Sequence, residues 1–133
     1  MRHTALAVAL ALAAGAAAGA GGKPARGEQL YARCLACHAL AYDRVGPRHC
    51  GLLGRRAGSV PGFDYSAAMK KSGIVWTAKA LDRFLADPLR RVPGTTMTYA
   101  GVANAKERAD LIAYLKQADD SPECRKWLGT RSP

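Results

Sequence analysis

The chain has 133 residues and a formal net charge of +10, from 20 lysines and arginines against 10 acidic residues. This length suits one domain and excludes a large multidomain enzyme. The hydrophobic content of 49% includes a very apolar start, and the residues after 20 are about 44% hydrophobic, an ordinary globular value that argues against intrinsic disorder. Four cysteines are too few for a disulfide scaffold of this length, so their spacing has to explain them.

Residues 1–20 are typical of a signal peptide. Arg2 and His3 precede an apolar run of Ala, Leu and Val, and Ala18-Gly19-Ala20 fits the small-x-small rule for cleavage. We expect cleavage after residue 20, which lowers the net charge to +9 because this segment carries one arginine and no acidic residue. The alternative is a retained membrane anchor, but the run over 5–20 is shorter and less apolar than the roughly 20 residues of a spanning helix.

The first predicted helix begins at Gly27. Tyr31, Leu35 and His38 lie on one helical stripe with Cys34 and Cys37 beside it, so we expect this helix to carry the first cysteine pair. The segment 39–63 is rich in glycine and proline and has no periodicity, which predicts a long irregular loop. Long loops in compact domains are usually functional.

Further helices are predicted in the second half of the chain. Residues 66–71 suit a short helix, and Thr77 suits the N-cap of a helix that stops at Asp87-Pro88. After a loop over 92–97, Asn104 with Glu107 three residues later begins the clearest helix, which runs to Ala118 with an apolar face. We find no strand alternation and no internal repeat. The sequence therefore predicts an all-α fold of three to five helices with long loops.

The residues Cys34-Leu35-Ala36-Cys37-His38 form the C-x-x-C-H signature of c-type haem attachment. Cysteines three residues apart on a helix project from the same face, so both thiols can reach the two vinyl groups of one porphyrin, and the adjacent imidazole can ligate iron. A zinc site would need a second ligand pair, for which only His49-Cys50 offers itself. A redox-active dithiol would need a preceding strand, which the sequence does not predict.

With this motif as the anchor, the chain resembles the class I cytochromes c, in the soluble branch that includes mitochondrial cytochrome c and its bacterial relatives. The matching segments occur in family order and are CLACH, VGPRHCGLLGRRAG, PGFDYSAAMKKSGIVW, VPGTTMTYAG and ERADLIAYLK. After the expected signal peptide at 1–20, the resemblance implies a cytochrome c domain at 21–118 and leaves a tail at 119–133 that it does not cover. It implies one covalent haem c in a cleft between loops, and a first helix that packs Gly27 and Tyr31 across the last helix near Leu111 and Tyr114.

The resemblance also implies the residues around the haem. Met97 is then the second axial ligand, and the Pro47 carbonyl accepts a hydrogen bond from His38. Other family positions donate hydrogen bonds to a buried haem propionate, and Arg55, Tyr65 and Trp76 occupy them. Alternatives for the sixth ligand are Met69, His49 and a lysine, and packing is the role we expect for Met69. Met69 and Phe84 replace an asparagine and a tyrosine of the familiar mitochondrial sequences.

Once the haem takes Cys34 and Cys37, two cysteines remain in an oxidising compartment. We expect a disulfide between Cys50 and Cys124 that ties the tail to the body. The alternative is two unpaired thiols.

Function follows from the ligands. Iron held by histidine and methionine has no open site, which favours a periplasmic one-electron carrier. The alternatives are a haem enzyme or gas-binding protein with a labile sixth ligand, and a dedicated redox subunit of one oxidoreductase. We expect a monomer that binds neither nucleic acid nor membrane and docks on redox partners with acidic faces, through basic residues at family positions around the haem edge: Arg33, Arg44, Arg90 and Arg91. These basic residues are few. Mitochondrial sequences carry further lysines at the positions that are here Leu89, Thr96, Ala103 and Asn104.

Overall fold

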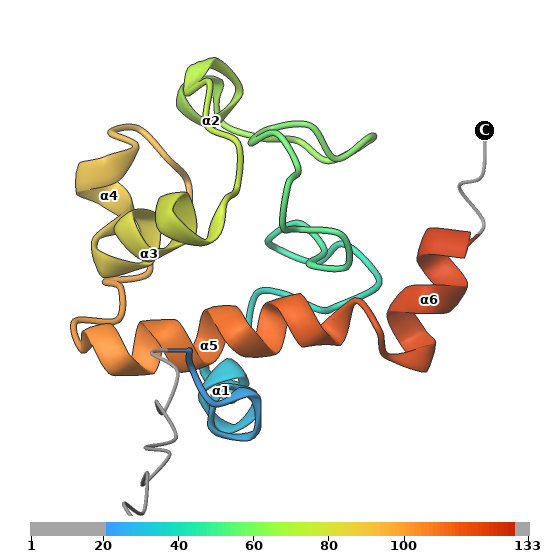
Figure 1. Cartoon of the computed structure of the whole chain (residues 1–133). Helices are drawn as coiled ribbons and strands as arrows, with labels where there is room; N and C mark the ends of the chain where they lie inside the picture. The colour runs from blue at the N-terminus through green and yellow to red at the C-terminus, as the bar shows by residue number, and fades with distance from the viewer. Residues whose placement is uncertain (1–20, 130–133) are drawn as a thin grey trace, which may run out of the picture.

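A computed structural model describes residues 21–129, so the predicted signal peptide at 1–20 lies outside the described residues. Within the described residues every regular element is a helix, long loops connect them, and the β-type pairing is one isolated antiparallel bridge between Arg56 and Val75. The elements, in chain order, are α1 (Pro24–Tyr31), η1 (Ala32–Cys34), α2 (Ala67–Lys71), α3 (Ala78–Ala86), α4 (Pro88–Arg91), α5 (Ala105–Ala118) and α6 (Pro122–Gly129) (Figure 1). The all-α prediction is confirmed.

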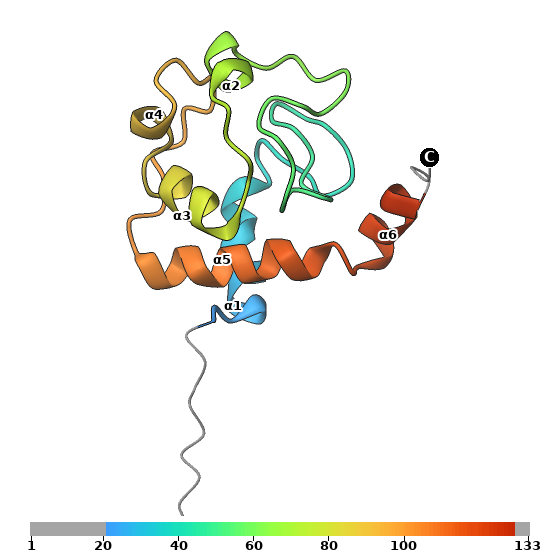
Figure 2. The ribbon, with the colours of Figure 1, turned by 45° about the horizontal axis from the view of Figure 1, so that its top comes forward.

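Helices α1 and α5 cross in direct contact, with the other helices and the long loop on the opposite side of α5 (Figures 1 and 2). Gly27 makes the close crossing possible, since a Cβ atom there would lie 2.0 Å from the Asp110 carbonyl oxygen and 2.7 Å from Cβ of Tyr114. The rings of Tyr31 and Tyr114 meet at 5.2 Å between centroids. The crossing that the resemblance implied is therefore confirmed.

The start of α1 is fixed by the buried Asp110, whose carboxylate accepts a hydrogen bond from the Lys23 backbone at 2.6 Å. The end of α1 corrects our expectation. The α-helix stops at Tyr31 and tightens into η1, so the cysteine motif starts in a 3-10 turn rather than inside the α-helix. One helical hydrogen bond continues from the His38 amide to the Cys34 carbonyl at 2.8 Å. Side-chain periodicity cannot separate these two helix types over one turn.

Side-chain caps begin the later helices. Asn104 caps α5 by accepting from the amides of Lys106 and Glu107 at 2.9 and 3.1 Å. The Glu107 carboxylate turns toward α1, where it pairs with Arg33 at 3.1 Å. Thr77 caps α3, as predicted, by accepting from the Ala80 amide at 3.1 Å.

Two helices were not predicted. Helix α4 follows α3 directly, because the Asp87 side chain accepts from the Arg90 amide at 3.1 Å and Pro88 occupies its first turn. Proline is well tolerated at that position, since a first-turn amide has no partner inside the helix. Helix α6 begins in the same way, with the Ser121 hydroxyl accepting from the Cys124 amide at 3.2 Å. These short helices make the segments after 87 and 121 helical rather than loop.

A disulfide joins Cys50 in the long loop to Cys124 in α6, with 1.95 Å between the sulfur atoms and 5.2 Å between the Cα atoms. Both cysteines are fully buried. Around this bond the Asp119 carboxylate accepts from the Gly51 amide at 2.7 Å, and the Arg48 guanidinium lies 4.4 Å from the ring centroid of Trp127. Helix α6 is thus held against the loop that carries residues 48–51.

One core cluster joins α1, α3 and α5 to the loops. Its best-buried members include Tyr31, Phe84, Leu111 and Leu115. Within residues 21–129, no helix combines the length and the apolar character needed to cross a membrane.

Candidate functional site

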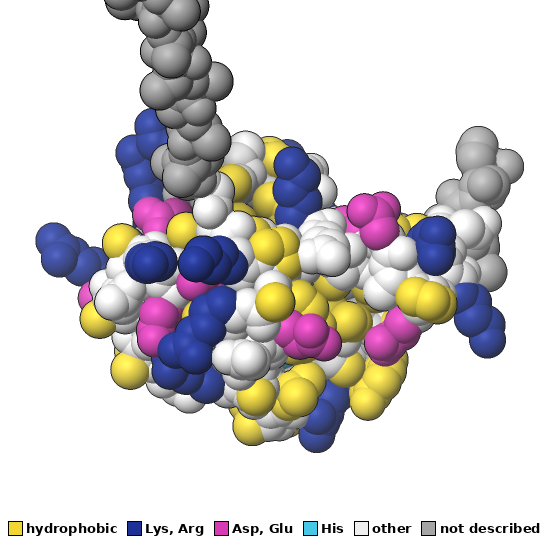
Figure 3. Space-filling model, turned by 60° about the horizontal axis from the view of Figure 1, so that its bottom comes forward, with side chains coloured by type: hydrophobic (Ala, Val, Ile, Leu, Met, Phe, Trp, Pro, Cys, Tyr) yellow, Lys and Arg dark blue, Asp and Glu magenta, His cyan; other side chains and the backbone are white. Residues whose placement is uncertain are grey.

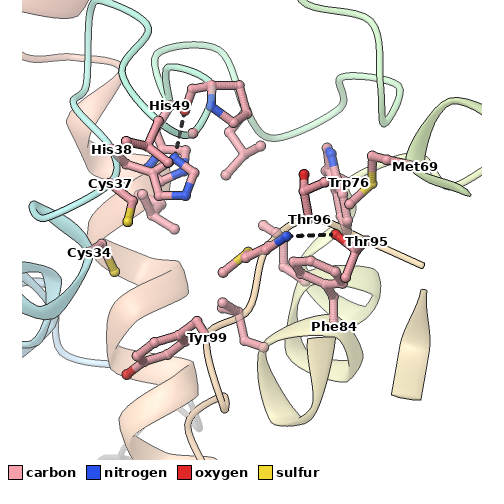
Figure 4. Close-up of a pocket in the computed structure, with 18 of the residues that line it drawn as sticks. Cys34, Cys37, His38, His49, Met69, Trp76, Phe84, Thr95, Thr96 and Tyr99 are labelled. Carbon is pink, nitrogen blue, oxygen red and sulfur yellow. Dashed lines mark hydrogen bonds between the residues drawn. The ribbon is translucent and has the colours of Figure 1, made fainter. Parts of the chain in front are cut away.

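A cavity of about 460 Å³ opens between the long loop, α3, α5 and the segment 95–99. Leucine, methionine and aromatic side chains make most of its lining. It brings together every cofactor residue that the sequence analysis singled out: Cys34, Cys37, His38, Pro47, Arg55, Tyr65, Trp76 and Met97. Figure 4 shows the cysteines and histidines on one wall, with Met69, Trp76, Phe84 and Thr95 facing them across the space.

Both cysteines of the C-x-x-C-H motif are free thiols at the edge of this cavity. Cys37 is exposed and Cys34 is partly buried. Burial raises the pKa of Cys34 to about 11, although the nearby Arg33 charge lowers it in part. Cys34 lines the cavity, so a group bound there can reach its sulfur.

His38 is buried, and its Nδ1 lies 2.7 Å from the Pro47 carbonyl oxygen. A carbonyl can only accept, so Nδ1 carries the proton and donates, which leaves Nε2 of the neutral ring with a lone pair. Burial lowers the pKa of His38, and the hydrogen bond to Pro47 opposes that shift. The neutral ring is the form that binds a metal.

The backbone of Gly46 lies against the same ring. A Cβ atom on this residue would be 2.2 Å from Cε1 of His38 and 2.6 Å from each ring nitrogen. The Gly46 amide donates to the Cys37 carbonyl at 2.7 Å, which ties this close approach to the cysteine motif. Only glycine fits between the loop and the imidazole.

His49 lies beside His38, with 4.2 Å between the ring centroids and 23° between the ring planes. Its pKa is lowered well below the ordinary value by burial, and the neighbouring His38 and Arg55 charges lower it further, so the ring is neutral near neutral pH. The sequence left His49 open as a sixth ligand. The stacking places His49 on the same wall of the cavity as His38, which disfavours it as a ligand opposite His38.

Met97 belongs to the segment that follows α4. Its backbone amide donates to the Thr95 hydroxyl at 3.2 Å, and Thr95 is itself buried and donates its amide to the Val92 carbonyl at 3.0 Å. These local bonds hold a partly buried thioether at the cavity lining. The sequence analysis missed Thr95, although a threonine two residues before a key side chain is a signal for such a local turn.

Polar side chains also line the cavity. Arg55 donates to the carbonyls of Cys50 and Arg48 at 3.2 and 2.8 Å. The hydroxyl of Tyr65 accepts from the Val60 amide at 3.3 Å, and Trp76 is buried with its ring 5.0 Å from that of Phe84. A guanidinium, a phenol and an indole together give an otherwise apolar cavity a means to hold one anionic group.

The remaining candidates for a sixth ligand are placed differently. Met69 is buried in the core cluster and also lines the cavity near Trp76 (Figure 4). No lysine is among the residues that line this cavity. A zinc site has no support either, because the part of the chain described here contains no cluster of three His, Cys, Asp or Glu side chains suited to a metal, and Cys50 is bonded to Cys124.

The chemistry of these side chains fits a covalently bound haem. Two free thiols three residues apart, a neutral imidazole with its Nε2 available and a thioether from a distant segment meet in one apolar space. Soft thioether and imidazole ligands suit iron in a porphyrin. The Gly46 backbone lies too close to the imidazole for any side chain at this position.

Comparisons with known proteins agree with this geometry. A family model described as Cytochrome c matches residues 24–119. Cytochrome c2 of Blastochloris viridis is 46% identical over 96 residues, which are 70% of this chain and 76% of that protein. Cytochrome c type-1 of Ascaris suum is also 46% identical over 96 residues, 71% of this chain and 81% of that protein. Among solved structures, cytochrome cH from Methylobacterium extorquens aligns with a TM-score of 0.71 and 43% identity, covering 72% of this chain and 99% of that one.

Proposed function

The chain belongs to the cytochrome c family, and from this premise we propose that it is a periplasmic one-electron carrier whose haem iron is ligated by His38 and Met97. As a class I cytochrome c it binds one covalent haem c and carries electrons, and it is not an enzyme. The haem supplies the one-electron couple, and the protein supplies attachment, ligation and burial.

The observation that carries the proposal is the meeting of the C-x-x-C-H motif and Met97 in one apolar cavity. Cys34 and Cys37 hold the haem through thioether bonds. His38 presents Nε2 to the iron because Pro47 fixes the proton on Nδ1 at 2.7 Å. Met97 approaches from a segment held by Thr95 and closes the second face. A thioether on the iron favours the ferrous state and raises the potential, which suits electron transfer.

A haem propionate buried in the cavity would be costly without hydrogen-bond donors. Arg55, Tyr65 and Trp76 line the cavity and carry the N–H and O–H groups that such a carboxylate needs. Arg55 brings a permanent charge as well, and its two bonds to loop carbonyls hold the guanidinium in place. We assign these three side chains to the propionate.

The periplasmic location rests on two features. Residues 1–20 have the pattern of a cleaved signal peptide, and the Cys50–Cys124 bond suits an oxidising compartment. Export leaves redox proteins as the partners, and we propose that the exposed Arg33, Arg44, Arg90 and Arg91 steer the protein, as a monomer, to acidic docking faces. On the side of the molecule where α1 lies, basic and acidic side chains are interleaved (Figure 3).

Two measurements on the purified holoprotein test the proposal. Intact mass gives one haem per chain and shows whether the chain starts at Gly21. Exposure of the reduced protein to carbon monoxide at neutral pH then tests the ligands: a closed site leaves the spectrum unchanged, because His38 and Met97 fill both axial positions. Ready formation of a carbon monoxide complex would contradict ligation by Met97 and would favour a haem protein with a labile sixth ligand.

A further inference from the structure

We infer that His49 is a positioning residue that fixes the orientation of the His38 ring by stacking on its face. The inference rests on the proposed function, in which His38 is the iron ligand. The hydrogen bond from Nδ1 to the Pro47 carbonyl restrains one edge of the ring and leaves its faces to be restrained by packing. A flat partner 4.2 Å away and within 23° of parallel restrains one of these faces.

His49 is itself held at both its side chain and its backbone. Its Nδ1 is hydrogen-bonded to the Tyr31 hydroxyl at 2.9 Å, and the edge of its ring meets the Tyr31 ring at 5.7 Å between centroids. Its backbone amide donates to the carbonyls of Ala39 and Leu40 at 3.1 and 3.0 Å. The next residue, Cys50, is bonded to α6. These contacts hold the His49 ring in one conformation against His38.

Tyr31 connects His49 to the crossing of α1 and α5. Its ring is 3% exposed and packs on Tyr114 of α5, so the hydroxyl that holds His49 cannot move without disturbing the contact between α1 and α5. The contacts run in one unbroken series from α5 through Tyr31 and His49 to His38. The rigid part of the fold thereby sets the orientation of the imidazole.

This role differs from simple space filling. An aliphatic side chain of similar volume would fill the place of His49 but offer no flat, polarisable face to the imidazole. The aromatic face of His49 would also stabilise positive charge on the neighbouring ligand, because a ring face attracts positive charge. Loss of the ring should therefore change the orientation of His38 and raise the reduction potential together.

Three variants and one control separate these roles in the holoprotein. His49→Leu removes the ring at similar volume, His49→Phe keeps a ring without the bond to Tyr31, and Tyr31→Phe removes the hydroxyl alone. Tyr114→Phe is the matched control, because it removes a hydroxyl from the same aromatic group without touching His49. The electron paramagnetic resonance spectrum and the paramagnetically shifted haem-methyl signals of the ferric protein report the orientation of the axial imidazole, and a redox titration gives the potential.

We expect His49→Leu to change both spectra and to raise the potential by the equivalent of a two- to tenfold change in the ferric to ferrous ratio, at most about 59 mV for one electron. His49→Phe and Tyr31→Phe both lose the bond between these two side chains but keep a ring against His38, so each should change the spectra in the same direction as His49→Leu but less. Tyr114→Phe should match the native protein. Rescue by a ring, with failure of an aliphatic residue of similar volume, is the pattern that space filling does not produce.

Native spectra and potential in His49→Leu would overturn the inference, as would a His49→Phe protein that differs from the native one as much as His49→Leu does. If His49→Leu gives no holoprotein, the comparison of Tyr31→Phe with Tyr114→Phe decides: equal spectra overturn the inference and distinct ones support it. The proposed function is tested separately by the weak sulfur-to-iron charge-transfer band of the native protein. Its absence there contradicts the Met97 ligand, whereas its presence in all proteins with unchanged orientation contradicts only the role of His49.

Discussion

At the scale of single residues, Gly46 sets how closely the backbone approaches His38. Any Cβ atom there would meet the ring atoms at 2.2 to 2.6 Å, far inside van der Waals contact. The ring has little room to retreat, because the Pro47 carbonyl holds Nδ1 and His49 covers a face. The Gly46 amide donates a hydrogen bond to the Cys37 carbonyl, so the backbone at Gly46 cannot move away easily either.

We therefore expect Gly46→Ala to lower the free energy of unfolding of the holoprotein by about 1–3 kcal/mol, as overpacking does. Denaturant unfolding followed by haem absorbance measures it. Gly129→Ala is the control, since a Cβ at that position meets nothing within 4 Å. The control should stay within about 0.5 kcal/mol of the native protein. Equal stability of the two variants would show that the loop yields easily and that Gly46 does not constrain the ring.

The site residues differ in how far the sequence could predict them. The C-x-x-C-H motif is local, so Cys34, Cys37 and His38 could be assigned from spacing alone. Met97 and the propionate donors could be assigned only through the family resemblance. The sequence of a loop rich in proline and glycine does not show which distant residues the loop contacts. The stacking of His49 on His38 could not be predicted, since two histidines eleven positions apart meet only through the turn that Gly46 and Pro47 make.

At the scale of elements, caps decide where the helices start. Asn104 satisfies two amides of α5, and α5 is the helix on which α1 packs and against which the cavity is built. The strong caps at Thr77 and Asn104 could be predicted because a side-chain acceptor precedes an apolar pattern there. Helices α4 and α6 carry the same kind of signal, Asp87-Pro88 and Ser121-Pro122, but are too short for periodicity to support it.

Removal of the Asn104 cap should lower the free energy of unfolding by about 1 kcal/mol in Asn104→Ala. The side chain is exposed, so the loss comes from two unsatisfied amides rather than from packing. Asn104→Ser keeps an acceptor and should restore most of the stability in the same denaturant titration. Equal losses in the two variants would contradict a capping role.

At the scale of the whole molecule, the fold consists of the α1–α5 crossing, the loops around the cavity, and a tail outside the family match. The match ends at residue 119, and α6 lies beyond it. The disulfide links α6 to the loop that carries His49 and Arg48. The tail thus restrains the loop beside His38, the proposed iron ligand, and it does so from outside the matched domain.

A cross-link between positions 50 and 124 closes a loop with a sequence separation of 74. In the chain-entropy model it contributes roughly 4 kcal/mol before strain is subtracted, so the Cys50→Ser, Cys124→Ser double variant should unfold at lower denaturant by up to that amount. Mass analysis of the unreduced holoprotein checks the bond itself, and we expect no alkylation at either position. Alkylation of both cysteines without reductant would refute the bond in the exported protein.

The central claim is that Met97 closes the sixth position of an electron-carrying haem. The most direct test compares Met97→Ala with Met69→Leu, since Met69 is the other methionine of the cavity and a swap of similar volume costs little. Met97→Ala should lose the weak sulfur-to-iron charge-transfer band, show a lower potential and bind carbon monoxide when reduced, while Met69→Leu keeps the band. A band that survives in Met97→Ala, or disappears in Met69→Leu, would contradict the assignment and with it the ligand set of the carrier.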